Sequence, residues 1–358
     1  MMDHLIFSLT TAIDLLALVT CLGTLSCRLW VLPPSATGEN TVVLCSLRTA
    51  LWRLLGGCLI ALTVSSVGEL LGRALTMSGL PPAMLGRTLP IVLLRTHYGR
   101  VWFVRLGALV MLWIGWGLGR RRQHTQTIPA SMLVAGGLIA LTRSLSGHAA
   151  DWGDMTLAVM MDGLHLFAGG LWGGGLLALT CMVLPAVNRC ADQRSLLLAD
   201  FARRFATLAS MALAVVLLTG LANAWVQVGT MQALWATPYG RTLLAKLFLV
   251  GLVLLLGTVN HYFYVPLLQQ QAGRPTTRGW LWHAAGLWQL LPTGWKTRAG
   301  SQVACHWWRT VVVESLLLIG VLLCTALLLQ APPARSSSHA THGHAGATST
   351  SAMSHDHH

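Results

Sequence analysis

Charged residues are scarce in this sequence. Only 10% of its 358 residues are Asp, Glu, Lys or Arg, whereas a soluble domain usually carries about 25%. Hydrophobic residues, in contrast, make up 54% of the chain. The shortage of charge argues against an ordinary soluble domain and predicts a protein that resides in a membrane.

Three further features that the sequence lacks narrow the possible classes of membrane protein. The apolar stretches lack the period-two alternation that is typical of a transmembrane β-barrel. No Cys-x-x-Cys pair is present, which disfavours a thiol-based metal or redox site. The sequence also has no hydrolase triad, phosphate-binding loop or zinc-protease motif, so we predict that the protein is not an enzyme.

Apolar runs long enough to cross a bilayer, about 20 residues each, recur along the chain. We find eight, at residues 5–31, 54–75, 101–118, 128–145, 157–184, 205–228, 243–264 and 311–329. Every backbone polar group in hydrocarbon must be paired within its own segment, so each run is expected to be a helix. The predicted fold class is all-α, a polytopic membrane helix bundle of about eight transmembrane helices.

The basic residues between the runs predict the topology. Lys and Arg fall into two alternating sets of fifteen and seven residues, and the positive-inside rule places the larger set in the cytoplasm. Both termini then lie on the outer side. The formal net charge of +13 is explained by this arrangement, so membrane lipids are expected as partners and nucleic acid is not.

An internal repeat suggests how the spans are organised. The segment THYGRVWFVR at 96–105 matches TPYGRTLLAK at 237–246, and Asp14 in the first run aligns with Asp162 in the fifth. Four spans per half would make the two repeats parallel. We therefore expect two parallel four-helix repeats.

The corresponding domains are a first membrane repeat at 1–150 and a second at 151–330. The second contains a Trp-rich cytoplasmic loop at 265–309, and residues 331–358 form a low-complexity tail that is expected to be disordered.

Polar residues gather around the start of the fifth run. Met161 and His165 are four residues apart, and Asp162 and His165 are three apart, so all three lie on nearly one side of a helix. His148 and Met155 precede them in the outer loop. An aspartate near mid-membrane costs roughly 2.5–3.5 kcal/mol, which makes such residues functional candidates. These five residues are the predicted metal site; the alternative is an Asp–His pair that only joins two helices.

Polar residues on other runs could line a path for the metal ion that leads through the same site. They are Glu69, Asn223, Tyr239 and Lys246. Lys246 could neutralise either Asp162 or Glu69 across the bundle, since buried charges need partners. Arg309 and Glu314 are expected to form a structural pair near the cytoplasmic face.

Glycines in the fifth run and histidines in the tail are two further features of the composition. Gly169 and Gly173 form a GxxxG pattern, for which close helix packing is favoured over local unwinding. The tail carries six histidines, His339, His342, His344, His355, His357 and His358. Imidazole is a good ligand for Cu, Zn or Ni, so we predict that the tail captures metal; a purification tag would be an unbroken run.

Several motifs together resemble a known family. They are SGHA at 146–149, MDGLHLFAGGLWGGG at 161–175, RRF at 203–205, TPYGRTLLAK at 237–246, and Arg309 and Glu314 ahead of the last span. In order and spacing they are similar to the copper-resistance protein D (CopD/PcoD) family of bacterial inner-membrane proteins, most strongly over residues 140–330.

The resemblance implies a function. It implies an inner-membrane, multi-pass protein with both termini periplasmic that moves copper ions from the periplasm towards the cytoplasm. A separate small periplasmic copper-binding protein is the partner that it suggests. His148, Asp162 and His165 match recurrent polar positions of the family. Thioether and imidazole ligands favour Cu(I) over Cu(II).

Two alternatives stay open. A b-type membrane cytochrome or oxidoreductase would need two facing histidines for haem, and His261 is the other intramembrane histidine, near the opposite end of its span. A copper-binding scaffold would hold the metal without passing it across the membrane.

Overall fold

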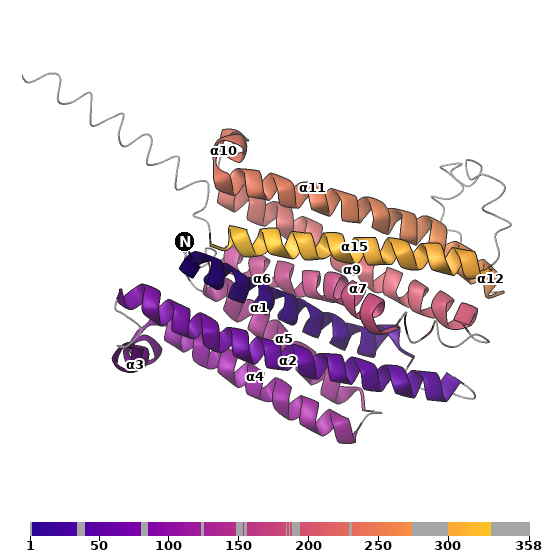
Figure 1. Cartoon of the computed structure of the whole chain (residues 1–358), viewed down its shortest axis with the longest axis horizontal. Coiled ribbons are helices and arrows are strands. Elements are labelled where there is room, and N and C mark those ends of the chain that lie inside the picture. Colours follow the sequence, from indigo (N-terminus) through magenta and orange to yellow (C-terminus); the bar gives the residue numbers. More distant parts are fainter. Residues whose placement is uncertain are drawn as a thin grey trace, which may run out of the picture.

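The structure is a computed structural model. It describes residues 2–33, 40–79, 85–122, 125–147, 156–183, 194–228, 231–273 and 300–330, together with the single residues 153, 185 and 187. Every secondary-structure element in this part of the chain is helical. Eight helices within it are long and apolar enough to cross a membrane. The predicted all-α, polytopic class is therefore confirmed (Figure 1).

Each of the first four spans contains one long helix. The short elements of this half are a π-helical turn after the first helix and a short helix between the second and third spans. The elements are α1 (Met2–Ser26) with the π-helical turn η1 (Cys27–Val31), α2 (Asn40–Ser78), α3 (Leu85–Arg95), α4 (His97–Arg121) and α5 (Thr127–Leu145). α3 is the short helix that leads from the second span into the third.

The last four spans contain more interruptions. The elements are α6 (Leu157–Gly169), η4 (Gly170–Gly174), α7 (Gly175–Ala178), η5 (Leu179–Val183), α9 (Arg194–Val228), α10 (Met231–Ala236), α11 (Pro238–Val259), η6 (Asn260–Tyr264), α12 (Val265–Gln271) and α15 (Gly300–Leu328). The fifth span runs from α6 to η5, and the seventh from α11 to α12.

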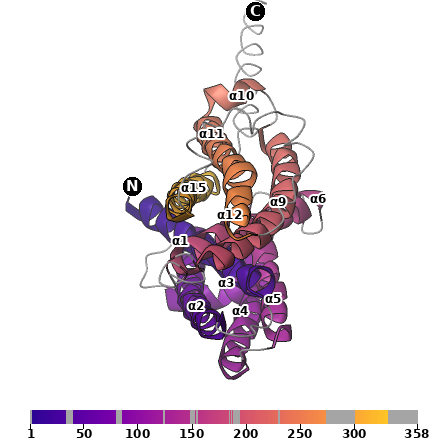
Figure 2. The same cartoon turned by 90° about the vertical axis from the view of Figure 1, so that its right-hand side faces the viewer.

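The spans run side by side along one common direction (Figure 1). α1 packs against α2, α5, η4 and α15, so it joins the first four spans to the last four. Seen end-on, α2, α4 and α5 lie on one side of α1, and α11 and α15 lie on the other (Figure 2). Ser8 donates a hydrogen bond to Gln330 Oε1 at 2.6 Å, so both ends of the described chain lie at the same end of the bundle.

Three helices begin earlier than hydropathy predicts. α2, α9 and α15 all extend beyond the apolar runs that start at 54, 205 and 311. Their extensions share one hydrophobic cluster, in which Leu47, Phe201 and Trp307 are buried. Charged residues dilute the apolar signal in these extensions, while one side of each helix still packs. The expected loop at 265–309 is likewise helical at its two ends, in α12 and α15, and 274–299 lies outside the described residues.

The two segments of the sequence repeat fold alike locally. Thr96 precedes α4 and accepts a hydrogen bond from the Gly99 N–H at 3.1 Å. Thr237 precedes α11 and accepts one from the Gly240 N–H at 3.0 Å. A threonine side chain at this position satisfies an otherwise unpaired N–H of the first helical turn. The division into repeats at 1–150 and 151–330 stays a prediction.

The closest approach of two helices joins α1 to η4. A Cβ atom on Gly174 would lie 1.7 Å from the carbonyl oxygen of Val19, and one on Gly23 would lie 1.8 Å from the carbonyl carbon of Gly174. Only glycine allows the two backbones to approach so closely. Of the two glycines in the GxxxG pattern, Gly173 packs closely, since a Cβ there would lie 2.8 Å from the Leu318 side chain of α15, whereas a Cβ at Gly169 would meet nothing within 4 Å.

Candidate functional site

Asp162 of α6 lies where three helices meet. Ser144 of α5 donates a hydrogen bond to Asp162 Oδ2 at 2.7 Å, and Asn223 of α9 donates one to Oδ1 at 3.2 Å. Both carboxylate oxygens therefore accept hydrogen bonds from neutral groups. This agrees with the prediction that Asp162 and Asn223 share one polar region.

His165 lies one turn further along α6 and faces α9. Its Nδ1 lies 3.0 Å from Thr219 Oγ1 and 3.1 Å from the carbonyl oxygen of Val216. The Thr219 hydroxyl donates its own proton to the carbonyl of Val215 at 2.6 Å. Both groups that face Nδ1 thus act as acceptors, so Nδ1 carries the proton.

This tautomer leaves a lone pair on Nε2 of His165. Among the residues that the structure describes, Nε2 has no hydrogen-bond partner. A histidine that ligates a metal typically donates its other ring N–H to a carbonyl or similar acceptor, which fixes the tautomer and the ring orientation. His165 therefore has the hydrogen-bond arrangement of a metal ligand.

Gly220 of α9 makes room for the His165 ring. A Cβ atom at this position would lie 3.0 Å from His165 Cε1 and 3.4 Å from Nδ1. Sequence reasoning missed Thr219 and Gly220. The spacing of Thr219 and Asn223, four residues apart, was the available signal, because it puts two polar side chains on one side of an apolar helix.

The remaining predicted residues on the last four spans have distinct places. Lys246 of α11 is partly buried and lies near enough to Asp162 for a favourable electrostatic interaction. Tyr239 is buried and donates a hydrogen bond to Gln227 of α9. Met161 is partly buried one turn before His165, on the same side of α6 by its spacing.

The other predicted metal-site residues lie outside the described part of the chain. These are His148, Met155 and the tail histidines His339, His342, His344, His355, His357 and His358. Within the described part, no three His, Cys, Asp or Glu side chains come together as a metal-binding group. A soft metal at His165 would therefore draw on the Met161 thioether or on residues outside that part.

A second polar cluster lies between the first four spans. Arg105 of α4 pairs with Asp14 of α1, and Arg143 of α5 pairs with Glu69 of α2. Cross-contacts join the two pairs, with Arg143 Nη1 3.0 Å from Asp14 Oδ2 and Arg105 Nη1 3.9 Å from Glu69 Oε2. Ser65 adds a hydrogen bond to Asp14 Oδ1 at 2.8 Å. Two acids and two arginines therefore balance each other inside the bundle.

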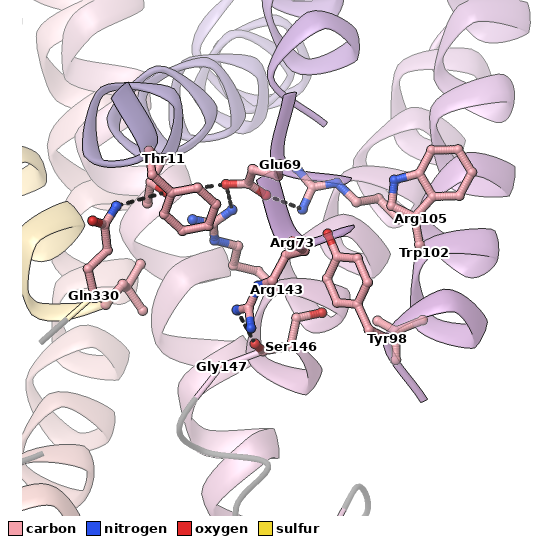
Figure 3. A pocket seen from close by; sticks show the side chains of 13 residues that line it. Thr11, Glu69, Arg73, Tyr98, Trp102, Arg105, Arg143, Ser146, Gly147 and Gln330 are labelled. Atoms are coloured by element: carbon pink, nitrogen blue, oxygen red, sulfur yellow. Dashed lines mark hydrogen bonds and ion pairs between the residues drawn. The ribbon is translucent and has the colours of Figure 1, made fainter. Parts of the chain in front are cut away.

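A small cavity adjoins these charges (Figure 3). Its volume is about 50 Å³, and Glu69, Arg105 and Arg143 line it together with Tyr98 and Gln330. A cavity of this size holds a few water molecules. Sequence reasoning named Glu69 alone from this cluster as a path residue. The structure brings Glu69 to arginines and not to Asp162.

The structure excludes one of the two alternative partners of Lys246 and corrects the expected pair of Arg309 with Glu314. Glu69 pairs with Arg143, so it is not the partner of Lys246. Glu314 accepts a hydrogen bond from Asn260 Nδ2 at 2.5 Å, and no ion pair with Arg309 exists among the described residues. A separation of five residues puts Arg309 and Glu314 on different sides of α15, whereas partners on a helix are three or four apart.

Eight apolar helices around a buried cluster of charged side chains and a second, partly buried polar cluster define a multi-pass membrane protein. Two family models match the sequence. The model for the "Copper resistance protein D-like, N-terminal domain" matches residues 1–159, and the model for "Copper resistance protein D" matches residues 199–328. The chain belongs to the copper resistance protein D family, as its motifs predicted.

Two characterised relatives are similar over about half of the chain. The "Copper transport protein CutJ" of Bacillus subtilis (strain 168) is 30% identical over 171 residues, which are 47% of this chain and 31% of the relative. The "Copper resistance protein D" of Pseudomonas syringae pv. tomato is 28% identical over 184 residues, 50% of this chain and 58% of the relative. The matches thus span less than two thirds of either relative. No solved structure gives a significant match.

Proposed function

We propose that this protein moves copper ions across the bacterial inner membrane, from the periplasm towards the cytoplasm, along a path through the polar residues between α6, α9 and α11. The observation that carries the proposal is the unpartnered Nε2 of His165, set by acceptors at Nδ1. Its lone pair is available to a metal ion, and the acceptors at Nδ1 already hold the ring in the tautomer and orientation that a metal-ligating histidine requires. The copper descriptions of the family and its relatives supply the ligand.

The charges around His165 favour Cu(I). Asp162 contributes one negative charge, and Lys246 offsets it. Because these two charges nearly cancel, a bound ion leaves the site with a net charge equal to its own. The electrostatic free energy of holding that charge inside the bundle rises with the charge of the ion. A monovalent ion costs less than a divalent one, and the Met161 thioether with the His165 imidazole suits Cu(I).

The expected topology supports the proposed direction. Both ends of the described chain lie at one end of the bundle, and the distribution of Lys and Arg favours the periplasm for this end. Asp162 and His165 lie within the first turns of α6, which begins at that end. Copper would then enter from the periplasm past His148 and Met155. The His-rich tail and a separate small periplasmic copper-binding protein would supply it.

Uptake of Cu(I) into proteoliposomes tests the proposal. His165→Ala should lower the initial uptake rate at least tenfold, because the only proposed imidazole ligand inside the bundle is removed. His306→Ala is the matched control, since His306 of α15 bonds to the carbonyl of Gln302 at 2.7 Å and lies outside the site. A folded His165→Ala variant that transports at the control rate would overturn the site assignment.

The same preparations separate the two alternatives. Copper binding without uptake by the parental protein would favour a scaffold that does not transport. A b-type cytochrome would show a Soret absorbance band. His261 lies in η6, at the other end of its span from the Lys246 region, so it is poorly placed to ligate one haem together with His165.

A further inference from the structure

Glu314 of α15 differs in its partners from the other carboxylates described within the spans. Asp14 and Glu69 form ion pairs with arginines, and Asp162 lies near Lys246. Glu314 is only 4% exposed, yet among the described residues it forms no ion pair. A carboxylate buried without a positive partner is strongly unfavourable, so this group requires either a proton or a cation.

The neighbours of Glu314 can form hydrogen bonds with its side chain both as a carboxylate and as a carboxylic acid. Asn260 of η6 donates from Nδ2 to Glu314 Oε2 at 2.5 Å, and Thr310 donates to Asn260 Oδ1 at 2.7 Å. A carboxamide has a donor end and an acceptor end, and turning it over exchanges them. The nitrogen of Asn260 can therefore donate to a carboxylate, and its oxygen can accept from a carboxylic acid.

The carboxyl group also borders a large, mostly apolar cavity. This cavity has a volume of about 350 Å³, and helices α9, α11 and α15 with η6 form its walls. In Figure 2, α11 runs on into α12, and α9 stands beside them. A Cβ atom on Gly257 would lie 3.0 Å from Glu314 Oε1, so the glycine leaves room beside this oxygen. The cavity gives small molecules access to the carboxyl group.

The chemistry around Glu314 favours a proton over a metal ion. Oxygen and amide groups surround it, and no group of three His, Cys, Asp or Glu side chains occurs among the described residues. Copper(I) selects sulfur and imidazole ligands. Several elements pack against α15, namely α1, α7, α9, α11, α12, η5 and η6. The other titratable side chains that the described cavity lining contains are His261 and Tyr262 of η6.

We propose that Glu314 is a proton-binding carboxyl group, which takes up one proton from water in the cavity to become a carboxylic acid and releases it again as a carboxylate. Asn260 and Thr310 position it in both states. This site is separate from the copper path around His165 and does not depend on copper transport.

Labelling with dicyclohexylcarbodiimide tests the proposal, because this apolar reagent modifies protonated carboxyl groups in membrane proteins. The full chain is labelled in liposomes without copper over a range of pH, and its peptides are analysed by mass spectrometry. We expect Glu314 to be modified at low pH and less so as the pH rises. Asp14 is the internal control and should stay unmodified, because Arg105 and Arg143 hold it as a carboxylate.

Two variants sharpen the result. Glu314→Gln should lose the modification. Asn260→Leu should keep it and move the midpoint of its pH dependence upward, because the carboxylate loses a hydrogen-bond donor. The proposal is overturned if the Glu314 peptide is recovered unmodified at every pH. It is equally overturned if added copper blocks the modification at constant pH, since Glu314 would then be a metal ligand.

Discussion

Each half of the chain has an aspartate close to a basic residue inside the bundle, and the two aspartates differ in their burial and in their partners. Asp14 contacts Arg105 and Arg143, and its side chain is fully buried. Asp162 occupies the matching position of the sequence repeat, but it accepts hydrogen bonds from neutral side chains and has Lys246 nearby. The repeat motif itself carries this difference, with arginine at 105 and lysine at 246.

The difference explains why only one cluster suits an ion. Arginine presents a rigid fork of donors that matches a carboxylate, whereas lysine is a point charge on a flexible stem. In the first half, two arginines saturate two acids, and the cluster holds four helices together. In the second half, His165 keeps a nitrogen without a partner. The first cluster has a structural role, and we propose that the second binds copper.

Removing Arg143 should have the largest effect on stability. Arg143→Met leaves Glu69 and Asp14 short of positive charge inside the bundle, and breaking a buried pair in this way costs about 3–5 kcal/mol. Thermal or denaturant unfolding in detergent measures the loss. Lys246→Met should cost less, because Ser144 and Asn223 still donate hydrogen bonds to Asp162.

A double variant provides the control. Arg143→Met with Glu69→Gln removes one charge of each sign, so it should recover much of the stability that Arg143→Met loses. Equal losses for Arg143→Met and Lys246→Met would contradict the distinction between the two clusters.

Thr219→Val should have a smaller effect, confined to copper. The substitution keeps the shape but removes the oxygen that orients His165 at 3.0 Å. Loss of such a supporting group typically lowers metal affinity about 10–100-fold, and we expect the lower end because the carbonyl of Val216 remains. Ser66→Ala is the matched change in the first cluster, where Ser66 accepts from Arg105 at 2.9 Å; it should leave copper affinity unchanged. If Thr219→Val and Ser66→Ala lowered copper affinity equally, the proposed difference in copper binding between the two clusters would be contradicted.

Hydropathy was sufficient to predict the eight spans, because a bilayer requires long apolar helices. It missed the helical extensions of α2 and α9, which are stabilised by packing and not by lipid. Helical spacing was sufficient to place Asp162 beside His165. It could not find the cluster of Asp14, Glu69 and Arg143, because their meeting depends on how separate helices are arranged.

The alignment of the two repeat segments also predicts charge pairs, which the spacing of residues within one helix does not reveal. Asp14 aligns with Asp162, and Arg105 aligns with Lys246. Read together, these matches predict an acid–base pair in each half, and the structure has Asp14 with Arg105 and Asp162 near Lys246. The partner of Glu314 had no comparable signal, because neither Glu314 nor Asn260 lies in the segments that the repeat aligns.

Imidazole nitrogen NMR of histidine-labelled protein tests the central claim most directly, with the His165 signals assigned by comparison with His165→Ala. Without copper, we expect Nδ1 of His165 to be protonated and Nε2 to be unprotonated. Addition of Cu(I) should shift the Nε2 signal while Nδ1 keeps its proton. A His165 ring with the opposite tautomer, or one whose signals stay unchanged while the protein takes up copper, would contradict the account.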